Sequence, residues 1–452
     1  MTYPTKVVLL GAVCLACLRD SGRAQGPADP LTLAEAIAWG VDNNLAVAGQ
    51  RLGVEVAARN NNWVTAGRAP VVQATIEVNS SISSQDNPAS FINGEFYSGN
   101  ATAGLAASYT LFNGYRVRFN RQRLGQLERQ AGDQLRQLIE QSVFAVAQAY
   151  YTAQLRAASR DVAVQALAIS RDRLAYQRLR RAYGQGASVD LLTAESNALN
   201  DSIGVEQAEV QLDNALRELY LALDAAPETF DGRPLGDTLG YDPRDWRLDD
   251  IAERLDSTGA LALLRTRRSV AATQTELARA ALQPTVDATA RLTHSRNAFQ
   301  FLGELPEGGG GPSGDLVFGS QGQGFLELNA AYTLWDAGER RRAIANAMVQ
   351  ERIAELALRD ARQAADTEAR NLLETYRSQR ALLSLREALI ATARANLELA
   401  DEQLAIGAIN SFDYRALQLA FVEAEQARLQ AVYDVLVTDL NLRRLTGDLV
   451  DG

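Results

Sequence analysis

The stretch YTLFNG, Tyr109–Gly114, returns almost unchanged as YTLWDA, Tyr332–Ala337, at an offset of 223 residues. The segments GQGASVDLL (184–192) and GAINSFDYR (407–415) keep this offset and share Gly, Ser and Asp at matching positions. Self-similarity at a fixed offset indicates duplicated structural units. We therefore predict two repeats, residues 31–226 and 251–446, joined by a Pro/Gly/Asp-rich connector at 227–250 and followed by a tail at 447–452.

Each repeat contains two segments in which apolar and polar residues alternate. In the first segment Val72, Ile76 and Val78 alternate with Thr75 and Glu77. This period of two predicts strands with one apolar and one polar face, at about 71–83, 102–112, 285–295 and 324–335. A length of about 11 residues fits a tilted strand that crosses a bilayer. The pattern also fits a half-buried soluble sheet.

Aromatic side chains gather where the second strand of each repeat ends. They are Tyr109, Phe112 and Tyr115 in the first repeat, and Tyr332 and Trp335 in the second. Aromatic girdles of this kind mark the membrane interface in transmembrane barrels. These five residues are therefore predicted to form an interfacial girdle.

Long helices are predicted to follow the strands, over about 115–183 and 338–406. A residue suited to a coiled-coil seam recurs every seven positions in the first helix, at Leu155, Val162, Ile169, Tyr176 and Tyr183, and the second helix keeps Leu385, Leu399 and Ile406 at matching places. At about 1.5 Å per residue each helix is roughly 100 Å long, too long for a compact globule.

Shorter helices are expected to stack end to end beside the long ones. The segments are 42–68 and 188–225 in the first repeat, and 260–282 and 411–445 in the second. The strands then lie at one end and the turns at 184–190 and 407–413 at the other. The connector, a helix at 31–41 and the C-terminal tail are expected in a belt near the middle.

Composition argues against several classes of function. The net charge of −10 and the pI of about 5.0 argue against a nucleic-acid binder, which needs a basic face. The chain has one histidine, His294, and two cysteines, Cys14 and Cys17. Its acidic residues are dispersed along helix faces, without the paired carboxylates that general acid–base catalysis requires. We predict no enzyme activity, no metal site and no cofactor.

Residues 1–24 are predicted to be a secretory signal peptide. Lys6 precedes the apolar run VVLLGAVCLACL (7–18), and a polar segment with small residues follows, so that cleavage after Ala24 is expected. The alternative is a lipoprotein signal with Cys17 as the acylated residue. Its motif, CLAC, lacks the usual leucine.

Four strands cannot close a barrel, and open strand edges do not survive in lipid. Copies of the chain must then pool their strands, giving eight in a dimer or twelve in a trimer, with the helices forming a hollow cylinder below. Both long helices begin with arginines, including Arg116, Arg118, Arg340 and Arg341. These either meet anionic head groups below the membrane or form solvated helix starts.

The sequence resembles the TolC family of outer-membrane efflux proteins. The resemblance rests on the duplication, on the phrase Y-x-L-F/W-N/D at each strand-to-helix junction, and on G-x(3)-S-x-D at both turns. It implies an α+β outer-membrane protein, with four strands per chain in a trimeric twelve-stranded barrel and an α-helical tunnel in the periplasm. It also implies two partners, a periplasmic adaptor and an inner-membrane transporter.

The resemblance assigns adaptor docking to the two turns, which we call the tips. The tip residues are Gly184, Ser188, Val189, Asp190, Gly407, Ser411, Phe412 and Asp413. The same residue types have a structural reading, in which Gly permits a tight turn and Ser and Asp cap the next helix. Family members carry a gating aspartate where this chain has Ala416, so that Asp190 and Asp413 are the candidates for an acidic gate.

The sequence thus predicts a passive outer-membrane duct of a tripartite efflux pump that exports small molecules. One alternative is the outer-membrane duct of a type I protein secretion system. An alternative of another class is a periplasmic or cell-surface coiled-coil scaffold. The cargo is not encoded in any feature of the sequence.

Overall fold

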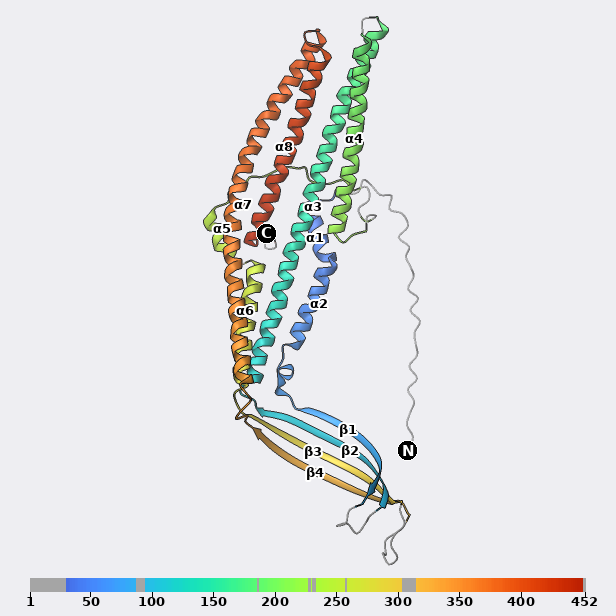
Figure 1. The fold of residues 1–452 in the computed structure, drawn as a ribbon. Coiled ribbons are helices and arrows are strands. Elements are labelled where there is room, and N and C mark those ends of the chain that lie inside the picture. Colours follow the sequence, from blue (N-terminus) through green and yellow to red (C-terminus); the bar gives the residue numbers. More distant parts are fainter. Residues whose placement is uncertain are drawn as a thin grey trace, which may run out of the picture.

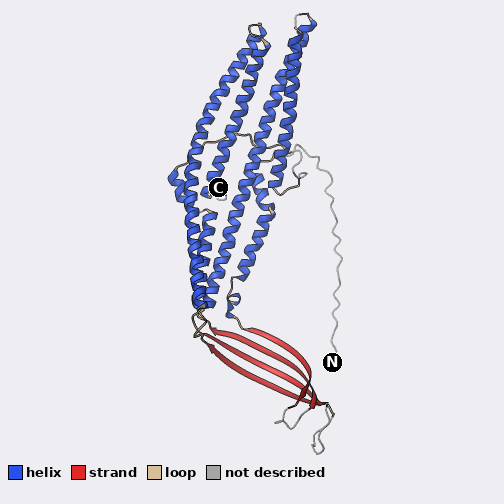
Figure 2. Ribbon diagram, in the orientation of Figure 1, coloured by secondary structure: helices blue, strands red, loops and turns tan. Residues whose placement is uncertain are grey.

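The computed structural model describes residues 30–86, 94–184, 187–226, 229, 233–256, 258–302 and 314–449. The predicted signal peptide and Cys17 lie outside the described residues. The molecule is elongated, with a strand region at one end and two helical hairpins that reach the other end (Figures 1 and 2). The predicted arrangement of strands, middle belt and tips is confirmed.

The strand region is one antiparallel sheet in the order β1-β2-β3-β4. Its strands are β1 (Val71–Gln85), β2 (Gly94–Phe112), β3 (Thr285–Phe301) and β4 (Val317–Ala331). All four were predicted, but the predicted lengths were wrong, since the strands have 15 to 19 residues. Backbone pairing continues through Ser, Gly and Asn positions where the apolar alternation fades.

Strand β4 ends four residues before the predicted 335. The reason is local, because the Thr333 carbonyl accepts a bond of 2.6 Å from the Arg340 guanidinium rather than from a neighbouring strand. Strand β2 has an irregularity of its own, between Thr110 and Phe112. Thr110 pairs with Asp287 but Phe112 pairs with Val286, so this bulge places Phe112 beside an apolar-face residue of β3.

Two helices of equal length form the spine of the molecule. They are α3 (Arg116–Ala182) and α7 (Glu339–Ala405), each of 67 residues, and they confirm the two predicted rods. In the half toward the tips, α4 (Ser188–Ala222) packs on α3 and α8 (Ser411–Thr446) packs on α7. In the half toward the sheet, α2 (Leu45–Asn60) packs on α3, and α6 (Gly259–Ala280) contacts both α3 and α7. The predicted end-to-end stacking is therefore confirmed.

Smaller elements depart from the prediction. The expected helix at 42–68 is divided among α1 (Leu33–Asn43), α2 and a π-helical turn, η1 (Val64–Arg68). The side chain of Asn44 caps α2 by accepting from the Val47 N–H at 2.9 Å, which starts a new helix there. Helix α5 (Leu248–Leu255) was not predicted, because it begins inside the Asp-rich connector.

In the first repeat, the predicted heptad seam is correct in the part of α3 that lies near the middle of the molecule, but not at the tip. Leu155 and Val162 are buried against Leu429 of α8, whereas Tyr183 at the tip is 74% exposed. In the second repeat the predicted seam was wrong, because Leu385, Leu399 and Ile406 are exposed. The buried residues of that helix recur every seven positions at Tyr376, Leu383, Ile390 and Leu397. The exposed set lies on a different face of α7.

In the described part of the chain, no helix combines the length and apolarity needed to cross a membrane.

Candidate functional site

Each tip turns on a glycine with a left-handed backbone. Gly184 has φ 73° and Gly407 has φ 75°, a conformation that costs a residue with a Cβ about 1–2 kcal/mol. Around Gly407, the Ala408 N–H donates to Gln403 O at 2.8 Å and closes the end of α7. The predicted turn role of both glycines is confirmed.

The predicted caps were wrong in position. The residue that caps α8 is Asn410, whose side-chain oxygen accepts from the N–H groups of Phe412 and Asp413, both at 2.9 Å. At the other tip the capping position is Ala187, which has no side chain to do this. Ser188 and Ser411 are the first helical residues, and the Ser411 hydroxyl accepts from Gln177 of α3 at 3.3 Å.

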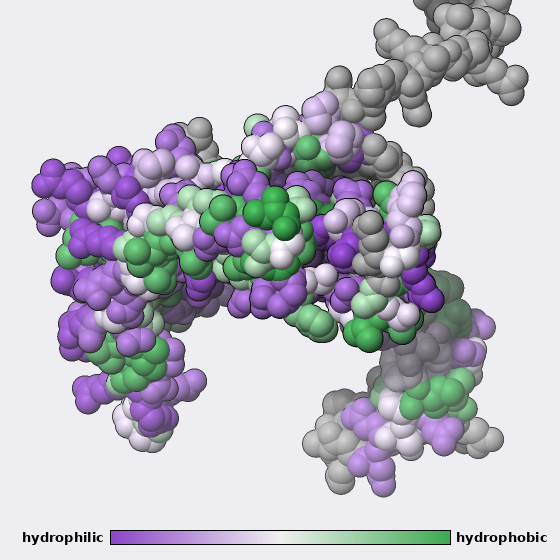
Figure 3. Space-filling model, turned by 90° about the horizontal axis from the view of Figure 1, so that it is seen from above, coloured by the Kyte–Doolittle hydropathy of each residue, from purple (hydrophilic) through white to green (hydrophobic). Residues whose placement is uncertain are grey.

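Both tips present apolar side chains to solvent. Val189 is 63% exposed and Phe412 is 62% exposed, and beside them Tyr183 and Ile406 are exposed at the ends of α3 and α7. The view from above the tips shows hydrophobic residues interspersed among hydrophilic ones (Figure 3). Apolar side chains clustered at the end of an exposed hairpin suit contact with another protein.

The two candidate gate residues lie in different surroundings. Asp190 is partly buried and lines a small cavity between the hairpins, together with Tyr414 and Arg415. Asp413 is exposed, as is Ala416 one turn further along α8. One chain therefore does not bring the two carboxylates into one site. An acidic ring at either position needs further copies of the chain.

The strongest polar contact near the tips joins the two hairpins. The Arg415 guanidinium on α8 donates to both carboxylate oxygens of Asp201 on α4, at 2.7 and 2.6 Å, and both side chains are largely buried. Ser170 of α3 also donates to Asp201. We call Arg415, Asp201 and Ser170 the hairpin link. A bidentate, buried pair of this kind has a fixed geometry and orients the hairpins relative to each other.

Two further residues of α8 extend the hairpin link. Gln418 is 2% exposed, and its amide donates to Ala166 O at 3.1 Å and to the Ser170 hydroxyl at 3.3 Å. Tyr414 is 3% exposed under the guanidinium of Arg173, 4.2 Å from the ring centroid. Burial, and then a hydrogen bond to Asp401, raises the pKa of the Tyr414 hydroxyl. The neutral phenol therefore remains at physiological pH.

The sequence did not reveal the hairpin link. Its two charged members lie 214 positions apart, and neither has a charged counterpart in the other repeat, where Leu192 matches Arg415 and Ala424 matches Asp201. The duplication therefore offered no signal for this pair.

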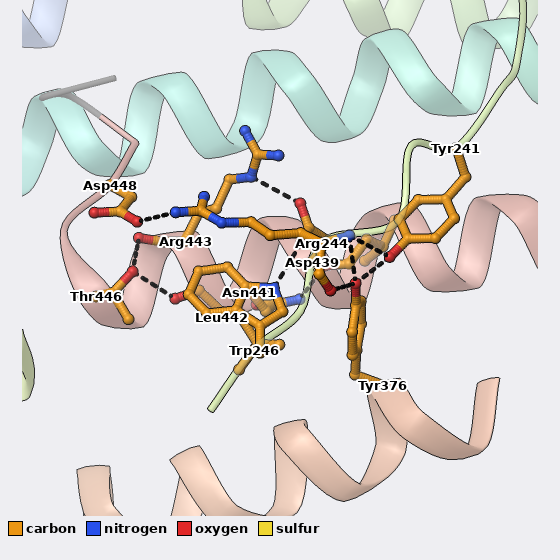
Figure 4. A network of polar contacts seen from close by, with 11 residues as sticks. Tyr241, Arg244, Trp246, Tyr376, Asp439, Asn441, Leu442, Arg443, Thr446 and Asp448 are labelled. Carbon is orange, nitrogen blue, oxygen red and sulfur yellow. Dashed lines mark hydrogen bonds and ion pairs between the residues drawn. The ribbon is translucent and has the colours of Figure 1, made fainter. Parts of the chain in front are cut away.

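The connector between the repeats is held in the belt by α7 and α8 (Figure 4). Tyr376 of α7 shares a hydroxyl–hydroxyl bond with Tyr241 and donates to Arg244 O at 2.6 Å. The Trp246 indole donates to Asp439 of α8 at 2.8 Å. Burial, and then the bond to Tyr241, raises the pKa of Tyr376. This side of the belt is a rigid, buried polar cluster.

The first repeat anchors the connector with another tyrosine. Tyr150 of α3 is fully buried, donates to Leu31 O at 2.8 Å and lies 2.9 Å from an Asp237 carboxylate oxygen. Burial, and then the bond to Asp237, raises its pKa. Gln154, one turn along α3, donates to Asp237 O at 2.6 Å. Each long helix thus holds one stretch of the connector at its middle.

Comparison with known proteins identifies the family. The family model described as outer membrane efflux protein matches residues 41–225 and 251–448, which is most of the chain and both repeats. The chain belongs to this family. The predicted resemblance and the predicted outer-membrane location are confirmed, and the coiled-coil scaffold is disfavoured. None of the curated proteins matches the chain in sequence.

Solved structures with the same fold are distant in sequence. A membrane protein from Pseudomonas aeruginosa is 20% identical with a TM-score of 0.74, over 92% of this chain and 93% of that one. The CmeC outer membrane channel of Campylobacter jejuni is 15% identical with a TM-score of 0.75, over 92% and 85%. The MtrE outer membrane channel of Neisseria gonorrhoeae, in its open state, is 18% identical with a TM-score of 0.70, over 92% and 88%.

The predicted girdle of this outer membrane efflux protein lies where sheet and helices meet. Phe112 and Tyr115 stack edge to face with ring centroids 5.5 Å apart, and Tyr109 precedes them on β2. Beyond the end of β4, Tyr332 is 60% exposed and Trp335 is 84% exposed. The predicted lipid contacts of these residues remain a proposal.

The four predicted head-group arginines of this efflux protein differ in their surroundings. Arg116, Arg118 and Arg341 are exposed. Arg340 is engaged within the chain, because its Nε donates to Asp336 at 2.6 Å in addition to its bond with Thr333. These contacts hold the pKa of the Asp336 carboxyl below its usual range. Arg340 is thus a structural residue of the junction, and the three exposed arginines are better candidates for lipid.

Among the described residues, no group of three or more His, Cys, Asp and Glu side chains is arranged to hold a metal ion.

Proposed function

We propose that this efflux protein works as a homotrimeric duct, with its sheets closed into a twelve-stranded barrel and its helices into a periplasmic tunnel. One observation carries this proposal. At each of three levels the chain forms an open layer of elements, and both edges of every layer are unpaired and largely exposed.

The first level is the sheet. Strands β1 and β4 each pair with one neighbour only. Because β1 runs antiparallel to β2, and the alternation continues to β4, the β1 edge of one copy can pair antiparallel with the β4 edge of the next. In lipid this pairing is obligatory, because each unsatisfied backbone group there costs several kcal/mol.

The second level is the helical layer toward the tips. Contacts run from α7 to α8, from α8 to α3 and from α3 to α4, so that α7 and α4 are the edges. Both edges carry an exposed apolar stripe, formed by Leu192, Leu199, Ile203 and Val210 on α4 and by Leu382, Leu385, Leu389 and Leu399 on α7. Stripes with this spacing pack helices together in coiled coils. This accounts for the α7 residues that face away from their own hairpin.

The third level is the helical layer toward the sheet. Its contacts run from α2 to α3, α6 and α7, which leaves α2 and α7 as edges. Exposed apolar residues again mark both edges, with Leu45, Leu52 and Val56 on α2 and Met348, Ile353 and Leu356 on α7. The first-repeat edge of one copy thus fits the second-repeat edge of the next at all three levels.

Three copies fit a duct better than two. Barrels of about eight strands are filled by their own side chains, whereas twelve strands leave more room inside. The solved relatives CmeC and MtrE are outer membrane channels, which supports the same role for this chain.

The trimer can be tested by mass and by one substitution at the helical edge. The purified protein in detergent is expected at three times the mass of its own mature chain and to form channels in a planar bilayer. Leu199→Glu is expected to shift the mass toward one chain, because it places a charge in the stripe. Gln211→Glu, at an exposed position whose side chain accepts from Arg156 of its own chain, is the control and should stay trimeric. A wild-type protein that remains a single chain and never inserts contradicts the proposal.

We further propose that the tips receive a periplasmic adaptor, which couples the duct to an inner-membrane transporter in a small-molecule efflux pump. The exposed Val189 and Phe412 side chains support this role. A photo-crosslinker at Phe412 should capture an adaptor in cells, whereas one at exposed Arg118, near the membrane, should not. For the gate, Asp413→Ala is expected to raise channel conductance if the exposed carboxylates of three copies form a ring. An unchanged conductance assigns the gate elsewhere.

A further inference from the structure

The polar face of the sheet changes character at the end farthest from the helices. Near the middle, Glu77, Thr102 and Ser295 are partners in one row across β1, β2 and β3. Two rows farther from the helices, the partners are Asn79, Asn100 and Asn297. A side-chain hydrogen bond joins Asn100 to Asn297.

Beyond the asparagine row this face becomes aromatic. Phe96, Phe299 and Phe301 lie on it, because each is an even number of residues from an asparagine of its own strand and Phe96 pairs with Phe301. The rings of Phe96 and Phe299 are 5.5 Å apart between centroids. Phe301 is 7% exposed, while Phe299 is 42% exposed. We call these three residues the phenylalanine cluster.

The cluster differs from the other aromatic residues of the described sheet. Phe325 shares its face but lies under the Arg291 guanidinium, 5.6 Å from the ring centroid. Tyr97 lies at the level of the cluster on the opposite, apolar face, where a tyrosine fits the membrane interface. Membrane anchoring therefore accounts for Tyr97, but not for phenylalanines on the face that a closed barrel turns toward its lumen.

We propose that the phenylalanine clusters of three copies converge on the barrel axis and form an aromatic constriction at the external mouth. This inference rests on the proposed trimeric duct. Nine phenyl rings, with a row of asparagines just below them, make an apolar ring inside a polar passage. Hydrophobic constrictions gate by excluding water, so the ring slows hydrated ions and charged solutes and lets apolar solutes pass. It selects among solutes at the outer end, far from the tips.

The test measures access from outside to a position below the cluster, so that closure at the tips does not affect the result. Thr102→Cys places a thiol on the lumen face, and Ala103→Cys places one on the lipid face of the same strand. The probes are a dye-linked, charged maleimide and small, uncharged N-ethylmaleimide, applied to intact cells. The cluster is changed to serine at all three positions, because Ser81, Ser83 and Ser98 already occupy neighbouring places on this face.

The charged probe should label Thr102→Cys slowly with the native cluster and severalfold faster with the serine variant. N-ethylmaleimide labelling should change little. Tyr97→Ser, at the same level on the other face, should leave both rates unchanged. If the triple variant does not assemble, the partly exposed Phe299→Ser alone should still give a smaller increase for the charged probe.

Equal labelling by the charged probe with and without the cluster would overturn the constriction. Labelling of Ala103→Cys in place of Thr102→Cys would overturn the assignment of faces. Every variant is also checked for its mass in detergent and for channel formation. A wild-type chain that forms neither trimers nor channels refutes the proposed duct itself, whereas a trimeric channel with unchanged access refutes only the aromatic mouth.

Discussion

The two repeats of this efflux protein have the same secondary structure but hold it with different side chains. Helices α3 and α7 both have 67 residues and start 223 positions apart. At the tips, however, one return helix is capped by Asn410 and the other begins after Ala187. In the belt, Tyr150 binds an aspartate whereas Tyr376 binds another tyrosine.

This difference distinguishes features that both repeats require from contacts that occur once in the molecule. Helix length, strand pattern and tip glycines occur in both repeats because each repeat builds one half of every layer. The hairpin link occurs once, because a contact between the two repeats has one partner in each. Positions that match in sequence but differ in contacts are therefore the most informative sites for mutation.

The largest effect is expected at the hairpin link. Asp201→Ala gives the first repeat the residue that the second has at Ala424, and leaves the Arg415 guanidinium buried without its partner. Breaking a buried pair in this way costs about 3–5 kcal/mol. A large fall in the apparent melting temperature of the purified protein is the expected result, together with higher channel conductance if the link holds the tips together.

A double variant sharpens this test. Asp201→Leu with Arg415→Leu removes both charges, and replacing a buried pair by apolar residues is often neutral or stabilising. The double variant should therefore recover most of the lost stability. If its conductance stays high while its melting temperature recovers, the link acts on the tips beyond its contribution to stability. If Asp201→Ala alone changes neither quantity, the link is unimportant.

The strand-to-helix junctions provide the second comparison. Gly114 matches Ala337, and both have a left-handed backbone, with φ 65° and 52°. A Cβ on Gly114 would overlap the Ala280 carbonyl oxygen and lie 2.6 Å from the Cβ of Gln283, whereas Ala337 is exposed. Gly114→Ala is expected to cost about 1–3 kcal/mol through overpacking, and Ala337→Gly should be neutral or slightly stabilising. Thermal unfolding of the two variants side by side checks this, and equal effects would contradict it.

These contrasts also show where sequence reasoning succeeded. The period-two strands, the long helices and the tip glycines follow from local patterns. Each pattern occurs in both repeats, so each of these predictions rests on two stretches of sequence. The family followed from the order of those motifs. The length of β2 could not be predicted in this way, because Gly99 occupies an apolar position and Phe96 lies on the polar face, while backbone pairing continues past both.

Local sequence patterns could not predict the contacts between segments that are distant in the chain. The seam of α7 was misassigned because the helix carries two apolar stripes, and only packing shows that Leu383 faces inward and Leu385 outward. The cap at Asn410 was missed because Ser188 and Ser411 match between the repeats, and the cap was therefore assigned to Ser411, one position after Asn410. Among the predicted tip residues, the structure supports the glycine turns and shows that Val189 and Phe412 are exposed, while docking and gating stay predictions.

A smaller effect is expected from the tip caps. Asn410→Ala removes the side-chain acceptor for two N–H groups and should cost about 1 kcal/mol. The reciprocal change, Ala187→Asn, supplies the missing cap and should stabilise the first hairpin by a similar amount. Hydrogen exchange of the first turns of α4 and α8 measures each change locally. The comparison fails if Ala187→Asn leaves exchange at the start of α4 unaltered.

The smallest effect is expected at Asp336, which matches Asn113. Each side chain accepts from a backbone N–H at the start of the following helix, Asn113 from Val117 at 3.4 Å and Asp336 from Arg340 at 3.2 Å. Asp336→Asn therefore keeps an acceptor for this N–H but loses the charge that pairs with Arg340, so the variant should be slightly less stable than the native chain at neutral pH. The pH dependence should differ, because the pKa of Asp336 is lowered by Arg340 in the folded chain. Its contribution is complete above the ordinary carboxyl pKa and is lost as the pH falls through the lowered value. Both chains share every other carboxylate, so acid titration should lower the stability of the native chain slightly more than that of the Asn variant, and the two should converge at low pH. Identical acid profiles would show that the charge on Asp336 does not distinguish the two junctions.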